Sequence, residues 1–284
     1  MKATYSQHLL DFKQASGTSR GILKQKETWF IKLETHEKWG IGECGMLRGL
    51  SCDDRPDYEE KLQWVCANIH LGKDLLWEAL MEFPSIQFGV EMAFLSLASK
   101  KPFELFPSDF TLGKESMEIN GLVWMGKEAF IKQQIEEKLA EGFRCIKLKI
   151  GAINFDEELQ LLGFIRQYFT PEQVEIRVDA NGAFDTSVAL NKINQLAGFK
   201  LHSIEQPIQK NNTDSMAELC KTSPIPIALD EELIGVFSVA EKEALYKPFK
   251  KYNPERLKSQ LDTNTMWSSF HAMYERFLNP ERVS

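Results

Sequence analysis

The chain has 284 residues, of which 43% are hydrophobic and 26% are charged, and its 41 acidic against 34 basic side chains give a net charge of -7. This length is sufficient for two domains or one large barrel. The acidic balance argues against a nucleic acid or an anionic membrane as a partner. The N-terminus has no signal-peptide core, and we find no apolar segment long enough to cross a bilayer.

The cysteines and histidines are scattered along the sequence. The five cysteines include no C-x-x-C pair, and the five histidines show no metal-ligand spacing. We therefore expect neither a disulfide framework nor a zinc cluster, and we expect the chain to reside in the reducing cytoplasm.

The first part of the chain, residues 1–117, is predicted to be an α+β domain. Trp29, Ile31 and Leu33 alternate with polar residues, which is typical of a half-buried strand. The predicted elements are a strand over 28–34, a glycine-rich strand and turn over 38–45, and helices over 56–80 and 84–99.

From residue 118 onward, strand and helix patterns alternate roughly every 25 to 30 residues, which predicts parallel strands joined by right-handed crossovers, in an open sheet or a barrel. The predicted strands cover 119–124, 145–150, 174–179, 202–206 and 226–230, and the predicted helices cover 126–142, 155–169, 186–197 and 213–221.

Charged residues end four consecutive strands of this region: Lys149, Asp179, Glu205 and Asp230. The carboxyl ends of parallel strands lie at the same end of a sheet, and in a barrel their inward-pointing residues converge. We therefore expect these four side chains to meet.

The strand CIKLKI (145–150) alternates two cations with branched apolar residues. Alternation places Lys147 and Lys149 on one face, pointing inward, and the apolar residues on the other, against the helices. A solvated sheet face also gives alternating charges, as at Glu175 and Arg177, and taken singly each charged residue fits that interpretation. Because such sheets are normally covered on both faces, four charged strand ends at a constant period favour a functional site.

Three carboxylates from adjacent strand ends supply oxygen ligands that suit Mg²⁺. Lys147 and a metal ion would both disfavour the ammonium form of Lys149, which would then act as a base. The combination predicts removal of a proton α to a carboxylate, with the enediolate held by Mg²⁺ and the remaining ammonium group.

Four motifs resemble, in order and spacing, the muconate-lactonizing branch of the enolase superfamily: CIKLKIG (145–151), VDANG (178–182), IEQP (204–207) and ALDE (228–231). Other segments resemble the o-succinylbenzoate synthases of menaquinone biosynthesis: SGTSRGIL (16–23), TWFIKL (28–33), GIGECG (40–45), SIQFGVEMA (85–93) and INGLVWMG (119–126). The resemblance covers residues 1–245.

The resemblance implies an α/β, enolase-like fold, with a capping α+β domain over 1–117 and a partial (β/α) barrel over 118–245, incomplete at its C-terminal end. The loop Ser16–Arg20 would close over the substrate. Lys149 would remove the α-proton and help the hydroxyl leave, and Lys147 would stabilise the enediolate. The implied Mg²⁺ ligands are Asp179, Glu205 and Asp230.

The implied activity is that of a hydro-lyase, the Mg²⁺-dependent dehydration of 2-succinyl-6-hydroxy-2,4-cyclohexadiene-1-carboxylate to o-succinylbenzoate. Its partner is a small-molecule carboxylate substrate, with no nucleic acid and no membrane, and the sequence leaves the oligomeric state open. The alternatives are a dipeptide epimerase or cycloisomerase of the same superfamily, or a truncated, catalytically incompetent chain.

The tail over 246–284 does not match the family pattern. Lys247 comes too early after Asp230 to be the lysine that family members carry on the sixth strand. We hypothesise a shift of reading frame near residue 246, and the alternative is a divergent tail that forms one amphipathic helix.

Overall fold

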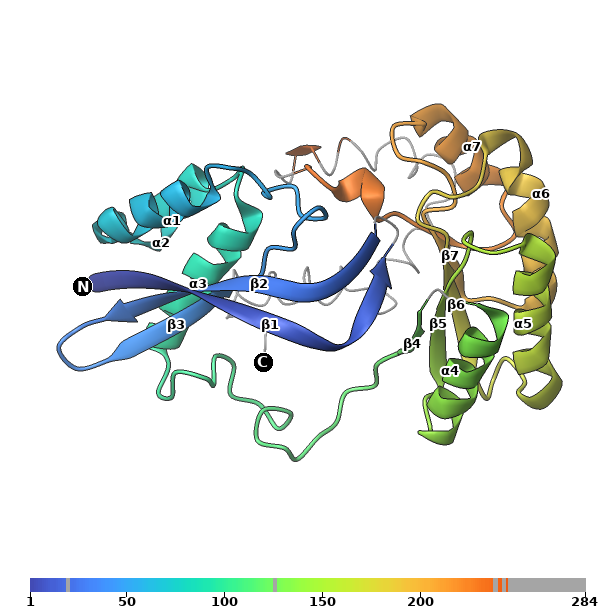
Figure 1. Cartoon of the computed structure of the whole chain (residues 1–284), viewed down its shortest axis with the longest axis horizontal. Helices are drawn as coiled ribbons and strands as arrows, with labels where there is room; N and C mark the ends of the chain where they lie inside the picture. Colours follow the sequence, from blue (N-terminus) through green and yellow to red (C-terminus); the bar gives the residue numbers. More distant parts are fainter. Residues whose placement is uncertain (19–20, 125–126, 237–239, 242–243, 245–284) are drawn as a thin grey trace, which may run out of the picture. The chain divides into compact units, whose positions relative to one another are not determined.

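The computed structural model describes residues 1–18, 21–124, 127–236, 240–241 and 244, which fall in two compact units (Figure 1). The first unit is Met1–Glu118, and the second begins at Ile119. The tail over 246–284, with Lys247, lies outside the described residues, and its interpretation stays a hypothesis.

The first unit contains a three-stranded antiparallel sheet in the order β1-β2-β3. Its strands are β1 (Lys2–Thr18), β2 (Gly21–Glu34) and β3 (Trp39–Cys44). The strands predicted over 28–34 and 38–45 are confirmed, and Trp29, Ile31 and Leu33 are buried as expected.

Strand β1 was not predicted, because its apolar residues do not alternate with polar ones. Leu9, Leu10 and Phe12 are exposed even though the strand pairs with β2 over nearly its whole length. The backbone of residues 16–18 pairs with that of residues 21–23. Residues 16–18 therefore form the end of a hairpin rather than an irregular loop. Residues 19–20 lie outside the described part, and closure of the segment Ser16–Arg20 over the substrate stays a prediction.

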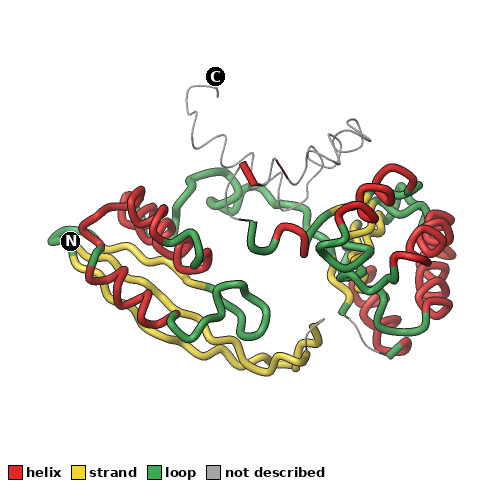
Figure 2. Tube along the Cα trace, turned by 90° about the horizontal axis from the view of Figure 1, so that it is seen from above, coloured by secondary structure: helices red, strands yellow, loops and turns green. Residues whose placement is uncertain are grey.

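The helices of the first unit lie on one face of its sheet (Figure 2). They are α1 (Tyr58–Ala67), α2 (Gly72–Ala79) and α3 (Pro84–Ala98). The single helix predicted over 56–80 is interrupted by a 3₁₀ turn, Ile69–Leu71, and α2 begins at Gly72, whose φ of 82° lies outside the range of a continuous α-helix.

Two glycines allow α3 to pack directly against β3. A Cβ atom on Gly42 would overlap the backbone carbonyl of Gly89, and one on Gly89 would overlap the sulfur of Cys44. The glycine-rich segment GIGECG is thus explained by close backbone packing rather than by a turn.

The second unit contains five parallel strands in the order β4-β5-β6-β7-β8. They are β4 (Gly121–Val123), β5 (Cys145–Lys149), β6 (Glu175–Asp179), β7 (Ser203–Glu205) and β8 (Ile227–Ala228). The connecting helices are α4 (Glu128–Ala140), α5 (Phe155–Tyr168), α6 (Thr186–Leu196) and α7 (Thr213–Thr222). The predicted strand–helix alternation is confirmed, and within the described residues β4 and β8 are the edges of the sheet.

The helices of the second unit gather on one side of its sheet, and the core lies between the two layers (Figure 1). Ile146 and Leu148 of β5, Ile176 and Val178 of β6 and Ile204 of β7 are all buried in this core. The other face of the same strands carries the polar residues, so the alternation predicted for CIKLKI is confirmed.

The five cysteines form no disulfide with one another in the described part of the chain. Burial raises the pKa of the Cys145 and Cys220 thiols to about 12, so both stay protonated near neutral pH and are poor nucleophiles. No helix in the described ranges has the length and apolar character needed to span a membrane.

Candidate active site at the strand ends of the second unit

The parallel register brings the charged strand ends side by side. Lys149 of β5 pairs with Asp179 of β6, and Asp179 pairs with Glu205 of β7. On the next strand Ala228 is level with Glu205, and Asp230 follows two residues later, at the start of a 3₁₀ turn. The structure therefore gathers these residues at one end of the sheet.

Both lysines of β5 reach across to the carboxylates. The Nζ atom of Lys147 lies 2.6 Å from Oε2 of Glu205 and 3.1 Å from Oδ2 of Asp179. The Nζ atom of Lys149 lies 2.5 Å from the same oxygen of Asp179 and donates to Oδ1 of Asn181 at 2.9 Å. In the described part of the chain Asp230 forms no ion pair with either lysine, so only two of the three expected carboxylates contact them.

The environment moves the carboxylate pKa values in opposite directions. Asp179 is fully buried, and burial opposes its charged form, but the Lys147 ammonium and the hydrogen bond from Lys149 outweigh this effect and lower its pKa. Burial, followed by the negative charge of Asp179, raises the pKa of Glu205 to about 7. Burial and the neighbouring charges of Glu231 and Asp179 also raise the pKa of Asp230.

These shifts bear on whether the residues fit a divalent cation. The charge of Asp179 raises the pKa of both Glu205 and Asp230, so the three carboxylates are close enough to repel one another, and a cation would relieve that repulsion. The described residues contain no three acidic, histidine or cysteine side chains already grouped around one point. Instead the ammonium of Lys147 lies against two of the carboxylates. The oxygens of Asp179, Glu205 and Asp230 are ligands of the kind that Mg²⁺ prefers, and the ion would take the place of the Lys147 ammonium beside Glu205 and Asp179.

Asn181 is a site residue whose contacts the sequence reasoning missed. Its Oδ1 accepts from Lys149, its Nδ2 donates to Oε1 of Glu231 at 3.0 Å, and its backbone N–H donates to Oδ1 of Asp179 at 3.1 Å. Its φ of 44° lies in the left-handed region, which asparagine tolerates better than most residues. The motif VDANG contains Asn181, but the periodicity of a strand does not predict the direction of a side chain in the loop that follows it.

Gln206, in the motif IEQP, was also missed. It is fully buried, and its Oε1 accepts from the backbone N–H groups of Asp230 at 3.1 Å and Glu232 at 3.4 Å. Its Nε2 donates to the carbonyl of Ile208 at 2.9 Å. Gln206 thus fixes the backbone that carries Asp230, which lies beyond the last hydrogen bonds of β8.

The backbone around these side chains is tightly held. Asp179 accepts through its carbonyl from Ile150 at 2.9 Å, and Glu205 accepts likewise from Ala180 at 3.0 Å, so the ladder continues one residue beyond β5 and β6. The carboxylate of Glu158, on α5, accepts from the Gly151 N–H at 2.5 Å. Functional side chains on such a rigid frame can keep their relative positions during a reaction.

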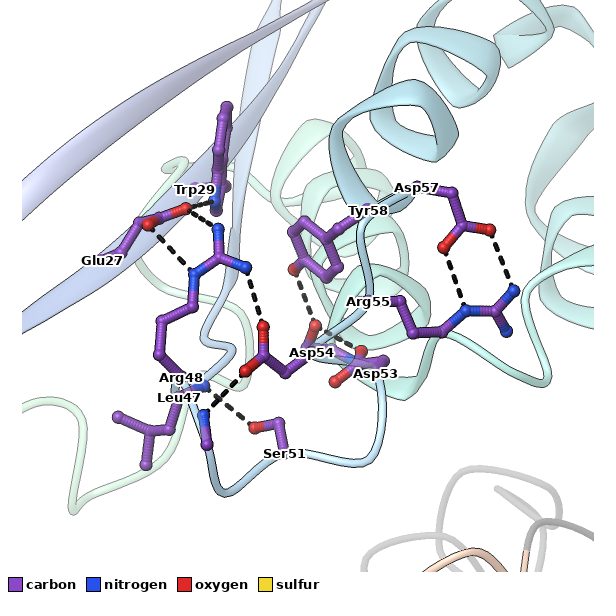
Figure 3. Close-up of polar contacts among 12 residues, drawn as sticks. Glu27, Trp29, Leu47, Arg48, Ser51, Asp53, Asp54, Arg55, Asp57 and Tyr58 are labelled. Atoms are coloured by element: carbon purple, nitrogen blue, oxygen red, sulfur yellow. Dashed lines mark hydrogen bonds and ion pairs between the residues drawn. The ribbon is translucent and has the colours of Figure 1, made fainter. Parts of the chain in front are cut away.

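A cavity of about 490 Å³ belongs wholly to the first unit and is lined by residues of β1, β2, α1 and the segment before α1. Figure 3 shows the polar network beside it, in which Arg48 donates to Glu27 at 2.6 Å and to Asp54 at 2.7 Å. Asp54 in turn accepts from the Gly49 N–H at 2.7 Å. The arginine is engaged by both carboxylates, and we interpret this network as a brace that ties the loop before α1 to β2.

Comparisons with known proteins agree with this architecture. A family model described as "MenC, N-terminal domain" matches residues 9–97, and one described as "Enolase C-terminal domain-like" matches residues 131–242. The o-succinylbenzoate synthase of Desulfotalea psychrophila is 42% identical over 267 residues, which cover 83% of this chain and 73% of the relative. A hydrophobic dipeptide epimerase from a Flavobacteria bacterium is 25% identical over 81% of this chain and 68% of its own length.

Solved structures give the same picture. The crystal structure of MenC from Desulfotalea psychrophila superposes with a TM-score of 0.75 at 36% identity, covering 88% of this chain and 76% of that protein. The o-succinylbenzoate synthase from Thermosynechococcus elongatus, complexed with Mg in its active site, superposes with a TM-score of 0.72 at 20% identity, covering 93% and 82%. The second likeness shows the fold alone, an enolase-like α/β architecture with an N-terminal cap and a parallel sheet.

Proposed function

The chain belongs to the o-succinylbenzoate synthase family of the enolase superfamily, and from this premise we propose how its strand-end residues serve that activity. The proposed reaction is the Mg²⁺-dependent dehydration of 2-succinyl-6-hydroxy-2,4-cyclohexadiene-1-carboxylate to o-succinylbenzoate in menaquinone biosynthesis. The observation that carries the proposal is the contact of Lys149 with Asp179 on adjacent parallel strands, beside Lys147 and Glu205.

In this proposal residues 1–117 are the capping domain, and residues 118–245 are part of a (β/α) barrel of the TIM type, in a cytoplasmic protein. Asp179, Glu205 and Asp230 would hold Mg²⁺. When bound, the ion would neutralise negative charge that develops on the substrate carboxylate.

Lys149 carries the proton transfers. As a neutral amine, its Nζ atom removes the proton from the ring carbon that bears the carboxylate, and the electron pair of that C–H bond passes into the carboxylate as an enediolate. The resulting ammonium then returns the proton to the leaving hydroxyl, so that one water is lost and the ring becomes aromatic. Because aromatisation favours the product, the protein mainly supplies positioning and charge stabilisation.

Lys147 supplies the positive charge opposite the enediolate. In this structure its ammonium is paired with Glu205 and Asp179, both of which are proposed metal ligands. If Asp179 and Glu205 held the cation, Lys147 would lose both partners, and its ammonium would be available to the substrate. In this structure burial lowers the pKa of Lys147, but the charges of Glu205 and Asp179 outweigh burial and raise it, so the ammonium form is favoured while both carboxylates face it.

The test is a dehydration assay on the purified full chain with the cyclohexadiene substrate and Mg²⁺, followed by the absorbance of the aromatic product. Replacing a general acid–base residue typically costs about 100-fold or more in rate, and we expect at least that loss for Lys149→Ala. The control is Lys210→Ala, which changes an exposed lysine in the loop before α7 and is expected to leave the rate unchanged.

Two results would contradict the proposal. Full turnover by Lys149→Ala would exclude this lysine as the base. Racemisation of a dipeptide without any dehydration would favour the epimerase alternative. The hydrophobic dipeptide epimerase from a Flavobacteria bacterium is 25% identical to this chain.

A further inference from the structure

The amide of Asn181 links the proposed base to a carboxylate outside the proposed metal site. Its Oδ1 accepts from the Nζ atom of Lys149 at 2.9 Å, and its Nδ2 donates to Oε1 of Glu231 at 3.0 Å. The three residues come from the ends of β5, β6 and β8, so the chain of contacts runs across the site.

Glu231 determines which end of the amide faces the lysine. An ammonium only donates and a carboxylate only accepts, so both contacts form with the amide oxygen toward Lys149 and fail if the amide is flipped. The backbone of Asn181 is fixed separately, by its N–H bond to Asp179. The remaining freedom is rotation of the side chain, and the hydrogen bond to Glu231 restricts that rotation.

The hydrogen bond from Asn181 is the one found for the Glu231 carboxylate in the described part of the chain. Glu231 begins the 3₁₀ turn Glu231–Leu233, and its Oε2 atom is buried with no hydrogen-bond partner within the described ranges. A buried carboxylate oxygen without a partner is unfavourable. One oxygen of the Glu231 carboxylate thus bonds Asn181 while the other is buried without a partner. Folding stability alone does not favour this arrangement, and a role at the site would account for it.

The two lysines differ in what they would keep when Asp179 and Glu205 bind a cation. Among the described residues, the Lys147 ammonium has polar contacts with these two carboxylates alone, whereas Lys149 contacts Asp179 and also Asn181. We propose that Glu231 is a positioning residue that acts through Asn181 to hold the Nζ atom of Lys149 in place after Asp179 has been taken up by the metal. This inference rests on the proposed function and deepens it.

The test measures the accessibility of each lysine in the full chain without metal. Asp179→Asn, which removes the competing ion pair, serves as the background, and Glu231→Ala is added to it. Modification by an amine-specific acid anhydride is followed separately at Lys147 and Lys149 by fragment mass spectrometry. Losing a partner that restrains a side chain should raise the modification rate of Lys149 by about threefold or more and leave that of Lys147 unchanged.

Two variants act as controls. Glu231→Gln keeps an oxygen that can accept from Asn181 and is expected to retain the slower rate. Glu232→Ala changes the next residue of the same turn, which contacts the backbone N–H of Asn211 instead, and is expected to behave like the background protein. Circular dichroism verifies that each variant is folded. If Lys149 is modified equally fast with and without Glu231, or if Glu232→Ala has the same effect, the inference is overturned.

A second readout separates this inference from the proposed function. In the otherwise unchanged chain, Glu231→Ala is expected to lower kcat about tenfold with KM almost unchanged, and Glu231→Gln is expected to restore most of the loss. If the unchanged chain does not dehydrate the substrate but the modification rates behave as predicted, the positioning role is supported and the proposed function is overturned.

Discussion

Glu205 and Asp179 are neighbouring carboxylates whose pKa values move apart, Glu205 up to about 7 and Asp179 down. Burial raises the pKa of both groups, and the charge of Asp179 raises that of Glu205 further, but two lysines outweigh burial at Asp179 whereas only one contacts Glu205 in the described part of the chain. Opposite shifts in adjacent acids are frequent at catalytic and metal sites. At this site they make Glu205 the carboxylate whose charge depends on pH near neutrality.

The shift of Glu205 gives a prediction for stability without metal. The folded state binds its proton more tightly than the unfolded state, so between the ordinary glutamate pKa of 4.5 and about pH 7 the free energy of unfolding falls as pH rises. The contribution of one such group is at most about 1.4 kcal/mol per pH unit.

Urea unfolding of the metal-free chain and of Glu205→Gln, at several pH values between 4.5 and 8, measures this contribution. The free energy of unfolding of Glu205→Gln, relative to that of the unchanged chain, should increase as pH rises and then level off above pH 7. A difference that is constant with pH would show that Glu205 titrates at its ordinary value.

At the residue scale, part of the site could be predicted from the sequence. Strand alternation and constant spacing are enough to bring Lys149, Asp179 and Glu205 together, because backbone hydrogen bonding fixes the register of parallel strands. The contacts of Asn181 and Gln206 could not be predicted in this way. They depend on left-handed backbone conformations in loops, and periodicity carries no information about those.

At the scale of elements, the packing of α3 on β3 depends on the absence of side chains at Gly42 and Gly89. Overfilling a packed contact typically costs about 1–3 kcal/mol. We therefore expect Gly42→Ala to lower the free energy of unfolding of the first unit by about that amount, measured by urea unfolding followed with tryptophan fluorescence.

Gly45→Ala is the matched control from the same glycine-rich segment. A Cβ atom there would lie 3.6 Å from the Nζ atom of Lys26, an ordinary van der Waals distance, and the change should cost less than about 0.5 kcal/mol. Equal destabilisation by the two substitutions would contradict close packing against α3 as the reason for a glycine at position 42.

The helices and strands of the second unit were predicted well because each has a strong apolar pattern. The failures in the first unit have identifiable causes. Strand β1 exposes Leu9 and Leu10 and therefore lacks a buried face that alternation could reveal. The helix predicted over 56–80 is interrupted between Ala67 and Gly72, which takes a positive φ, and apolar spacing continues across such a break.

At the scale of the whole molecule, family membership and local geometry support each other. Identity of 42% over most of the chain identifies the family, and we propose that the strand-end residues carry out its chemistry in this chain. Several superfamily members share a similar fold with different activities, so the fold alone does not specify the substrate.

The central claim is that Asp179, Glu205 and Asp230 together bind Mg²⁺ beside the proposed base. Calorimetric titration of the full chain with Mg²⁺ at pH 6 and pH 8 tests it most directly. We expect one ion per chain, bound about tenfold more tightly at pH 8 because Glu205 must lose its proton, and undetectable binding by Asp179→Asn. Binding that is independent of pH and unchanged in variants of all three carboxylates would contradict the account.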